Sequence, residues 1–308
     1  MTRGKQTWTV NVRTEIDAVA GVNGLTESEV GVVFQPIVDV ANGRLLAHEA
    51  LVRCTRPEYA SPPTLFEHAV KEGATGRLGR LIRDVAFSTC GDVPLFVNVH
   101  PEELASRWLV RTDDPLCFHT KAVFVEVTES AAFTHFDLCM GALKELCART
   151  GAKLVIDDFG AGYSNLDRLV LLDPAVVKLD LALTRGVDAN PRRQAVVRHI
   201  TNLCRDLGAR VVSEGVETLD ELSCIRDLGV DYAQGYLLAR PAAPPPPIQW
   251  PLAPRTRTIP GFRRTTDPKG RAVVGRAKGT LSPTPPSAPR RASSVDTPAS
   301  KRRPPSKS

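Results

Sequence analysis

Short apolar runs alternate with longer segments in which apolar residues recur every three or four positions. The longer segments predict helices, because this spacing places apolar side chains on one helical face. One such face is Val196, Val197, Ile200, Leu203, Cys204 and Leu207. The predicted strands are 95–99, 123–127, 154–156, 176–179, 211–213 and 232–237. The predicted helices are 65–90, 102–110, 137–149, 192–207 and 218–228, the last with a capping box at Thr218 and Glu221. Strands that alternate with helices favour a parallel sheet.

Two further apolar runs, 32–39 and 44–53, precede this alternation and flank Ala41-Asn42-Gly43. An Asn-Gly pair between two β-rich segments favours a tight hairpin turn. We therefore expect the first two strands to run antiparallel.

Polar side chains follow the apolar runs at or near their downstream ends. They are Glu49, Asn98, Glu126, Asp157, Asp158, Lys178, Glu214 and Gln234. Residues from so many strand ends can converge only if the sheet closes into a barrel, whose active site would lie at that mouth. The oxygen-rich set favours metal-dependent chemistry. An open doubly wound sheet is the structural alternative, but it would need an early phosphate-binding glycine turn, and none is evident.

Composition divides the chain into an acidic body and a basic tail. Residues 242–308 hold 14 of the 40 Lys and Arg but 2 of the 34 Asp and Glu, so the tail carries +12 and the rest −6. The tail also holds 15 of the 25 prolines, and we expect it to be disordered because it has too few apolar residues to form a core. We predict an N-terminal extension at 1–29, one catalytic domain at 30–241 and this tail at 242–308.

The composition also bears on the compartment. No run approaches the roughly 18–20 apolar residues of a membrane span, and residues 1–20 lack the apolar block of a secretory signal. The seven cysteines are dispersed and include no Cys-x-x-Cys pair, which favours reduced thiols over a zinc site or a disulfide framework. We therefore expect a cytoplasmic protein without a transmembrane segment.

Most of these polar residues also have an ordinary structural interpretation when taken alone. Glu49 or Glu126 could be a carboxylate paired with a buried Arg, and Asn98 could cap a turn. The adjacent Asp157 and Asp158 are harder to explain in this way, because like charges repel unless a cation lies between them. Lys178, placed between Val and Leu, would be costly to bury without an anion nearby.

Together the segments resemble the EAL-domain family of cyclic di-GMP phosphodiesterases. Eight motifs carry the resemblance, in family order and over about residues 30–241: Phe34-Gln35-Pro36-Ile37-Val38-Asp39, Glu49-Ala50-Leu51-Val52-Arg53, Phe96-Val97-Asn98-Val99, Val125-Glu126-Val127-Thr128-Glu129, Asp157-Asp158-Phe159-Gly160-Ala161-Gly162-Tyr163-Ser164, Lys178-Leu179-Asp180, Ser213-Glu214-Gly215-Val216-Glu217-Thr218 and Gln234-Gly235-Tyr236-Leu237. The second contains the Glu-Ala-Leu signature itself.

The resemblance implies a modified TIM (βα)8 barrel with an antiparallel first strand, and hydrolysis of cyclic di-GMP to linear pGpG. It also implies two Mg²⁺ or Mn²⁺ ions, for which oxygen ligands are suitable. Their implied ligands are Glu49, Asn98, Glu126 and Asp157 for one ion, and Asp157 with Asp158 for the other.

The remaining implied roles concern water, substrate and support. Glu214 would be the general base or water-orienting carboxylate, Lys178 the cation that positions the water, and Gln234 a further orienting group. Gln35 and Arg53 would bind the substrate, Arg53 through a phosphate. Glu129 would hold the loop 159–165, whose Gly160 and Gly162 allow a bend, and Asp180 and Glu217 would support the ligands.

A few positions depart from the family pattern. His100 stands where a Ser often follows the metal-binding Asn, Cys54 where an aromatic residue often follows the Arg, and Ser213 where Ala is frequent. His100 could also be a fortuitous metal ligand. No Gly-Gly-Asp-Glu-Phe cyclase motif is evident.

Two alternatives belong to other functional classes. The first is a non-catalytic cyclic di-GMP receptor that acts through a partner protein, although such receptors usually lose metal ligands. In the second, the basic tail has the leading role and tethers the protein to nucleic acid or an anionic membrane. The favoured interpretation of the tail is a solvated linker. A homodimer is plausible from the resemblance alone.

Overall fold

The computed structural model describes residues 21–106, 109, 111–128, 136–161 and 166–252. For residues 136, 137, 265–266 and 272–273 it describes the backbone alone. The chain separates into two compact units, Met1–Arg255 and Thr256–Ser308. In the second unit, β9 (Thr265–Thr266) pairs antiparallel with β10 (Ala272–Val273).

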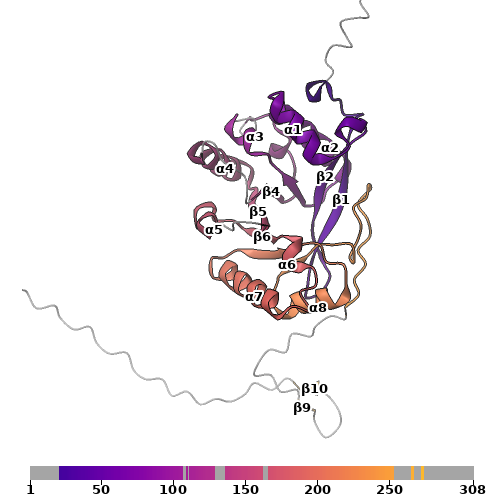
Figure 1. Cartoon of the computed structure of the whole chain (residues 1–308), viewed down its shortest axis with the longest axis vertical. Helices are drawn as coiled ribbons and strands as arrows, with labels where there is room; N and C mark the ends of the chain where they lie inside the picture. The colour runs from indigo at the N-terminus through magenta and orange to yellow at the C-terminus, as the bar shows by residue number, and fades with distance from the viewer. Residues whose placement is uncertain are drawn as a thin grey trace, which may run out of the picture. The chain divides into compact units, whose positions relative to one another are not determined.

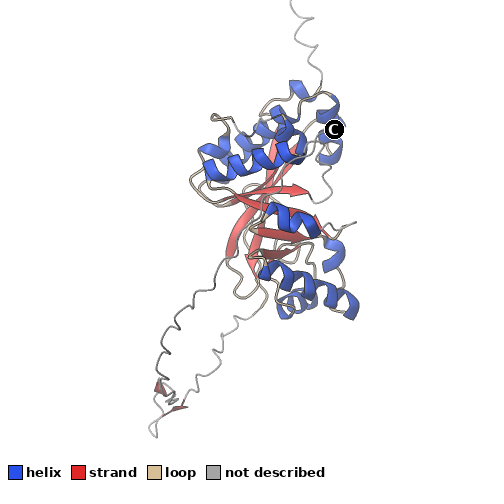
Figure 2. Cartoon of the chain, turned by 90° about the vertical axis from the view of Figure 1, so that its left-hand side faces the viewer, coloured by secondary structure: helices blue, strands red, loops and turns tan. Residues whose placement is uncertain are grey.

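Eight strands of the first unit form a closed barrel with helices around it (Figures 1 and 2). They are β1 (Val30–Asp39), β2 (Leu45–Cys54), β3 (Leu95–Asn98), β4 (Val123–Thr128), β5 (Lys153–Phe159), β6 (Val176–Leu179), β7 (Arg210–Ser213) and β8 (Tyr232–Ala233). Strand β1 is antiparallel to both neighbours, β2 and β8, whereas the other neighbouring pairs are parallel. The prediction of a modified (βα)8 barrel with an antiparallel first strand is confirmed.

The helices follow the strands as expected, with several local differences. They are α1 (Pro62–Lys71), α2 (Thr75–Cys90), α3 (Pro101–Ala105), α4 (Phe136–Thr150), α5 (Leu166–Leu172), α6 (Leu181–Thr184), α7 (Pro191–Asp206) and α8 (Leu219–Asp227). Short 3₁₀ turns lie at Val22–Gly24, Pro57–Tyr59 and Pro115–Cys117. The predicted capping box is present, with Thr218 and Glu221 at the start of α8.

Four details of the predicted elements are wrong. The helix expected at 102–110 is α3, which ends at Ala105. The single helix expected at 65–90 is two helices, because the backbone at Gly73 turns through a φ of +63° between them. Strand β8 ends at Ala233 rather than at residue 237. On α7, Val196 and Leu207 are 45% and 40% exposed, and the buried face is centred on Val197 and Cys204.

The ends of the first unit pack more closely than the sequence suggested. In the predicted N-terminal extension, Val22 and Leu25 are buried in a cluster with residues of α1 and α2. In the predicted tail, the backbone of Ala242 bonds to that of Phe34 in both directions, and Trp250 packs against the core. The expectation of disorder is therefore wrong for 242–252. Residues 253–308 lie outside the described residues apart from β9 and β10, and their disorder stays a prediction.

A buried ion-pair triad ties helix α2 to the segments that follow β3. Arg83 Nη1 lies 2.8 Å from Glu103 Oε2, and Arg83 Nη2 lies 2.7 Å from Asp114 Oδ2. All three side chains are at most 1% exposed. Replacing Arg83 would therefore leave two carboxylates buried without their cation.

We expect Arg83→Met to lower the free energy of unfolding by about 3–5 kcal/mol, the usual cost of removing one partner from a buried ion pair. The matched control is Arg80→Met on the same helix, because Arg80 and its partner Asp113 are 29% and 53% exposed, and a surface pair of this kind is worth at most about 1 kcal/mol. Urea unfolding of both variants measures the difference. Equal, small losses would contradict the assignment of Arg83 as a buried structural cation.

Candidate metal site at the barrel mouth

The inward faces of the strands explain why the predicted residues meet. On five strands an apolar residue that fills the barrel interior stands two positions before a polar one: Phe96 and Asn98, Phe124 and Glu126, Val155 and Asp157, Val176 and Lys178, Val212 and Glu214. Residues two apart on a strand face the same side. The apolar residues form a floor, in which Phe96 stacks on Phe124 at 4.2 Å, and the polar ones form a layer above it at the mouth.

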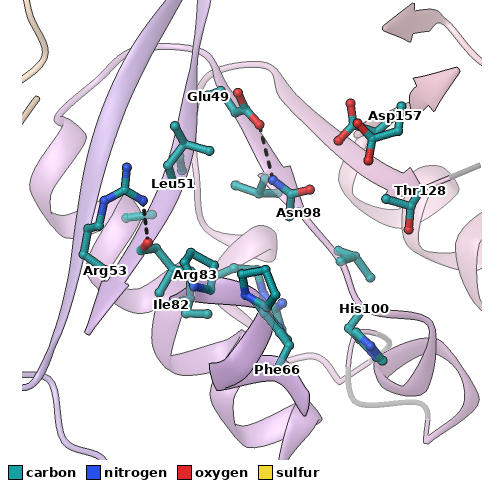
Figure 3. A pocket seen from close by; sticks show the side chains of 18 of the residues that line it. Glu49, Leu51, Arg53, Phe66, Ile82, Arg83, Asn98, His100, Thr128 and Asp157 are labelled. Carbon is teal, nitrogen blue, oxygen red and sulfur yellow. Dashed lines mark hydrogen bonds between the residues drawn. The ribbon is translucent and has the colours of Figure 1, made fainter. Parts of the chain in front are cut away.

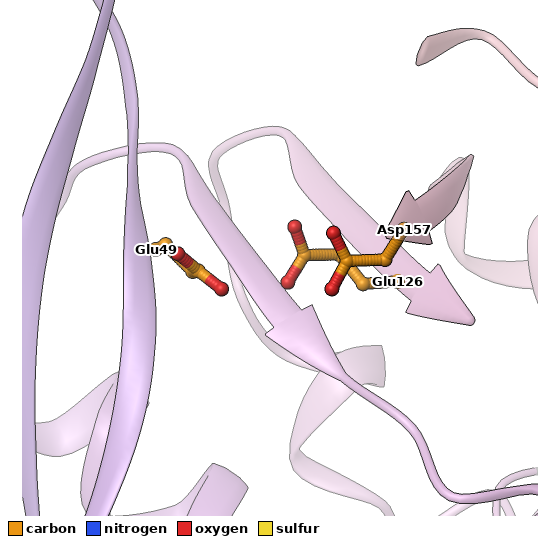
Figure 4. Close-up of side chains that lie close together, drawn as sticks. All are labelled: Glu49, Glu126 and Asp157. Atoms are coloured by element: carbon orange, nitrogen blue, oxygen red, sulfur yellow. The ribbon is translucent and has the colours of Figure 1, made fainter. Parts of the chain in front are cut away.

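Lys178 lies among four carboxylates of this layer. Its Nζ is 3.2 Å from Glu49 Oε1, 2.8 Å from Glu126 Oε1, 3.0 Å from Asp157 Oδ1 and 2.6 Å from Glu214 Oε1. Its side chain is 1% exposed. Figure 4 shows Glu49 facing Glu126 and Asp157 across the barrel. One buried ammonium therefore links carboxylates from four separate elements.

Asp158 reaches the same mouth because the strand is irregular there. Neighbouring residues on a regular strand point to opposite faces, which would turn Asp158 away from Asp157. The pairing of β5 with β6 shifts register between Ile156 and Phe159, and Asp158 has a φ of +56°. As a result Asp157, Asp158 and Glu214 offer oxygens within 4.8 Å of one another. Gly160, two residues after Asp158, has a φ of +99°, as the predicted bend requires.

Amide side chains orient Glu49 from the other side. Gln234 Nε2 donates to Glu49 Oε2 at 2.5 Å and to Gln35 Oε1 at 3.0 Å. Asn98 Nδ2 lies 3.4 Å from Glu49 Oε1. Gln35 in turn donates to the carbonyl oxygen of Ala239, so the chain after β8 holds this group. The predicted metal, water and substrate residues Gln35, Glu49, Asn98 and Gln234 are thus brought into one network.

Burial and neighbouring charges shift the pKa values of these groups. Burial raises the pKa of Glu126 well above its ordinary value. The negative charges of Glu49 and Asp157 raise this pKa further, whereas the positive charge of Lys178 lowers it in part. Burial likewise raises the pKa of Glu214 to about 8 and, with the charge of Asp157, raises the pKa of Asp158. Burial opposes the charged form of Lys178, but the surrounding carboxylates raise its pKa well above the ordinary value.

Glu49 behaves differently from Glu126 and Glu214. Burial alone would raise its pKa, but the charge of Lys178 and hydrogen bonds from Gln234, Lys178 and Asn98 lower it overall. The charged form is therefore favoured more strongly at Glu49 than at Glu126.

The donor set fits divalent cations. Two groups of carboxylates have oxygens close enough to share an ion: Glu49, Glu126 and Asp157, and then Asp157, Asp158 and Glu214. Five carboxylates face one ammonium, so four negative charges are in excess when all are ionised, which two divalent cations would balance. Glu126 Oε2 and Gln234 Oε1 are also buried without a hydrogen-bond partner among the described residues. Oxygen ligands of this kind suit Mg²⁺, Mn²⁺ and Ca²⁺.

Two cavities open beside these carboxylates. The first, of about 450 Å³, runs from Glu49, Asn98 and Asp157 past Arg53 to Phe66 and Ile82 (Figure 3). Here Arg53 Nη1 donates to the carbonyl oxygen of Val52 at 2.7 Å.

The second cavity, of about 250 Å³, lies on the other side of Glu49. Gln35, Glu214 and Gln234 line it together with Arg185 and Tyr236. The close packing of Gly235 shapes this wall, since a Cβ there would lie 2.1 Å from the carbonyl oxygen of Val216.

The other predicted residues have different surroundings. Asp180 accepts the N–H of Ala182 and caps α6, and Glu217 pairs with Arg185 beside the second cavity. His100 Nδ1 accepts the N–H of Glu102 as the cap of α3, and His100 is in neither of the two carboxylate groups. Glu129 and Gly162 lie outside the described residues, so their assigned roles stay predictions.

Sequence reasoning did not single out two residues that line the cavities, Phe66 and Arg185. Phe66 belongs to a helix and Arg185 ends a short one, so neither stands at the end of an apolar run. Only the pairing of distant segments places them near the carboxylates.

Comparison with known proteins agrees with this geometry. The EAL domain model matches residues 21–241. Cyclic di-GMP phosphodiesterase RocR of Pseudomonas aeruginosa is 33% identical over 74% of this chain, and cyclic di-GMP phosphodiesterase PA2567 of the same organism is 30% identical over 73%. The chain spans 61% and 40% of these two relatives, less than two thirds of each.

Solved structures show the same likeness. The manganese and cyclic di-GMP complex of BlrP1 from Klebsiella pneumoniae at pH 6 has 34% identity and a TM-score of 0.64, over 74% of this chain and 60% of that one. Its calcium and cyclic di-GMP complex at pH 8.0 has 33% identity and a TM-score of 0.63, over 70% and 57%. No helix in the described part of the chain is long and apolar enough to cross a membrane.

Proposed function

Because this chain belongs to the EAL domain family, we propose that it hydrolyses one phosphodiester bond of cyclic di-GMP and releases linear pGpG. Such an activity would lower the concentration of this second messenger in bacterial signalling. The observation that carries the proposal is the complete carboxylate set around Lys178 at the mouth of the barrel. A receptor that only binds the nucleotide has no need for two groups of ion-binding carboxylates.

In this proposal two Mg²⁺ or Mn²⁺ ions bind at the mouth. Glu49, Asn98, Glu126 and Asp157 would hold one ion, and Asp157 and Asp158 the other. When bound, such ions lower the pKa of a water nucleophile and neutralise charge on the phosphate. The two groups of closely spaced carboxylate oxygens and the unpartnered oxygen of Glu126 support this ligand set.

The residues of the chain would position the other reactants. Glu214 would accept a proton from the attacking water, and its contact with Lys178 would orient its carboxylate. Lys178 would remain protonated and stabilise negative charge that develops on the phosphate oxygens.

Substrate binding is assigned to the cavity walls. Arg53 would contact a phosphate through its planar donor fork, and Gln35 would contact the substrate beside Gln234. The location of Arg53 in the first cavity and Gln35 in the second, on either side of Glu49, supports a substrate that spans both.

We also infer a cytoplasmic location and a homodimer. All seven cysteines are free thiols, as expected in a reducing compartment. Leu166, Val170 and Leu171 of α5 are 53%, 68% and 52% exposed, and this apolar surface supports association of two copies.

The experiment that tests the proposed function follows pGpG by chromatography. The full chain is incubated with cyclic di-GMP and Mg²⁺ or Mn²⁺, and in parallel with EDTA. We expect product only where the divalent ion is present. Cyclic di-GMP that binds with no product in either metal would instead favour a receptor.

A further inference from the structure

The first cavity has carboxylates at one end and mainly apolar side chains at the other. Figure 3 shows Glu49 and Asp157 at one end and Phe66, Ile82 and His100 at the other, where Arg53 and Arg83 also lie. We propose that His100, backed by Phe66, is a substrate-binding residue on whose ring one guanine base of the substrate stacks. This inference rests on the proposed function and assigns a role to a residue that departs from the family pattern.

The dimensions of the cavity suit a nucleotide. Its volume of about 450 Å³ falls within the roughly 300–1,000 Å³ of small-molecule sites, which are mostly apolar with a few convergent polar groups. A nucleotide has the same division, with a charged phosphate and a flat base. A phosphate at the carboxylate end, where the ions would bind, leaves the apolar part of the cavity for a base.

Two aromatic rings offer that base a surface. The rings of Phe66 and His100 are stacked, with 5.7 Å between their centroids and 8° between their planes. Both residues line the cavity, and Figure 3 shows them at the end away from Glu49. Nearly parallel rings at this centroid distance are offset and lie in separate planes, so a base would stack on the face of one ring while the other ring supports it. Stacking on aromatic side chains is a general way to hold a base.

The ring of His100 is held in place before any ligand binds. His100 Nδ1 accepts the N–H of Glu102 at 3.2 Å, and the backbone N–H of His100 donates to Glu103 Oε1 at 3.2 Å. Glu103 is itself paired with buried Arg83 at 2.8 Å. A ring fixed in this way loses little conformational entropy when a base stacks on it.

The position of His100 along the chain also fits. It stands two residues after Asn98, which contacts Glu49 at the mouth. One short segment therefore connects the proposed phosphate end of the cavity with its proposed base end.

A matched pair of variants separates the ring from the helix cap. His100→Asn keeps a good capping side chain but removes the ring, whereas His100→Phe keeps a ring but removes the cap. Affinity for cyclic di-GMP is measured by calorimetry in Ca²⁺, with the sample checked for pGpG, and kcat and KM are measured in Mn²⁺. We expect His100→Asn to weaken Kd and raise KM about tenfold, in line with the loss of one base stack, with kcat within about twofold. His100→Phe should stay within about threefold of the wild type in Kd.

The results distinguish this inference from the proposed function. Unchanged Kd in His100→Asn, or a loss in His100→Phe as large as in His100→Asn, would overturn the stacking role even if pGpG is formed normally. The expected Kd pattern with no pGpG from the wild-type protein would keep the stacking role and overturn the phosphodiesterase. A wild-type protein that fails to bind cyclic di-GMP would overturn the stacking role as well.

Discussion

Replacing Asp157 by Asn is expected to lower kcat for cyclic di-GMP by more than about 100-fold while leaving the fold intact. Asp157 belongs to both carboxylate groups that could hold an ion, so one substitution affects both. Loss of a residue that only supports a metal ligand already costs about 10–100-fold, and loss of a shared ligand should cost more. The rate of pGpG formation in saturating Mn²⁺ measures the effect.

The same variant should not be less stable without metal. Asp157→Asn preserves the shape of the side chain and removes one of five crowded carboxylates, so Tm in EDTA should be equal to or higher than that of the wild type. Asp206→Asn is the control, because Asp206 is exposed at the end of α7 and should change neither quantity. An active Asp157→Asn protein, or one that is unfolded in EDTA, would contradict the assigned role.

Replacing Lys178 by Met is expected to affect stability and activity together. Lys178 Nζ is the cation shared by Glu49, Glu126, Asp157 and Glu214, and it is almost fully buried. Its removal leaves buried carboxylates without their partner, and we expect the free energy of unfolding in EDTA to fall by about 3–5 kcal/mol. The rate in Mn²⁺ should fall at least about 100-fold, because a fixed charge near the phosphate is lost.

Added Mn²⁺ should restore much of the lost stability of Lys178→Met, since ions that bind the folded state stabilise it and also neutralise the carboxylates. Urea unfolding with EDTA and with Mn²⁺ provides the comparison. Lys144→Met, at an exposed position on α4, is the control and should behave as the wild type does. If Lys178→Met is as stable as this control in EDTA, the carboxylates do not depend on Lys178 for their charge balance.

The sequence was sufficient for the barrel and for most of the residues that meet at its mouth. Strands impose a two-residue period, so a polar residue two positions after a buried apolar one, as in Phe124 and Glu126, lies on the same inward face. Closure of the barrel then brings these positions together. The hairpin of β1 and β2 followed equally directly from Asn42 and Gly43 between two apolar runs.

Other features depend on contacts that a local pattern does not contain. The irregular backbone that turns Asp158 toward the mouth depends on the pairing of β5 with β6. The stack of His100 on Phe66 joins residues 34 positions apart, and the triad centred on Arg83 joins three segments. The packing of 242–252 was missed for a related reason. A proline-rich composition does not reveal that Ala242 forms a β-bridge with Phe34.

We propose that the carboxylates at the barrel mouth support attack of water on a phosphodiester of cyclic di-GMP. The most direct test is a single-turnover reaction of the full chain with cyclic di-GMP and Mn²⁺ in ¹⁸O-labelled water, analysed by mass spectrometry. We expect pGpG that carries one ¹⁸O on its terminal phosphate, and none of this product from Asp157→Asn. Intact cyclic di-GMP after reaction with the wild-type protein, or unlabelled pGpG, would contradict it.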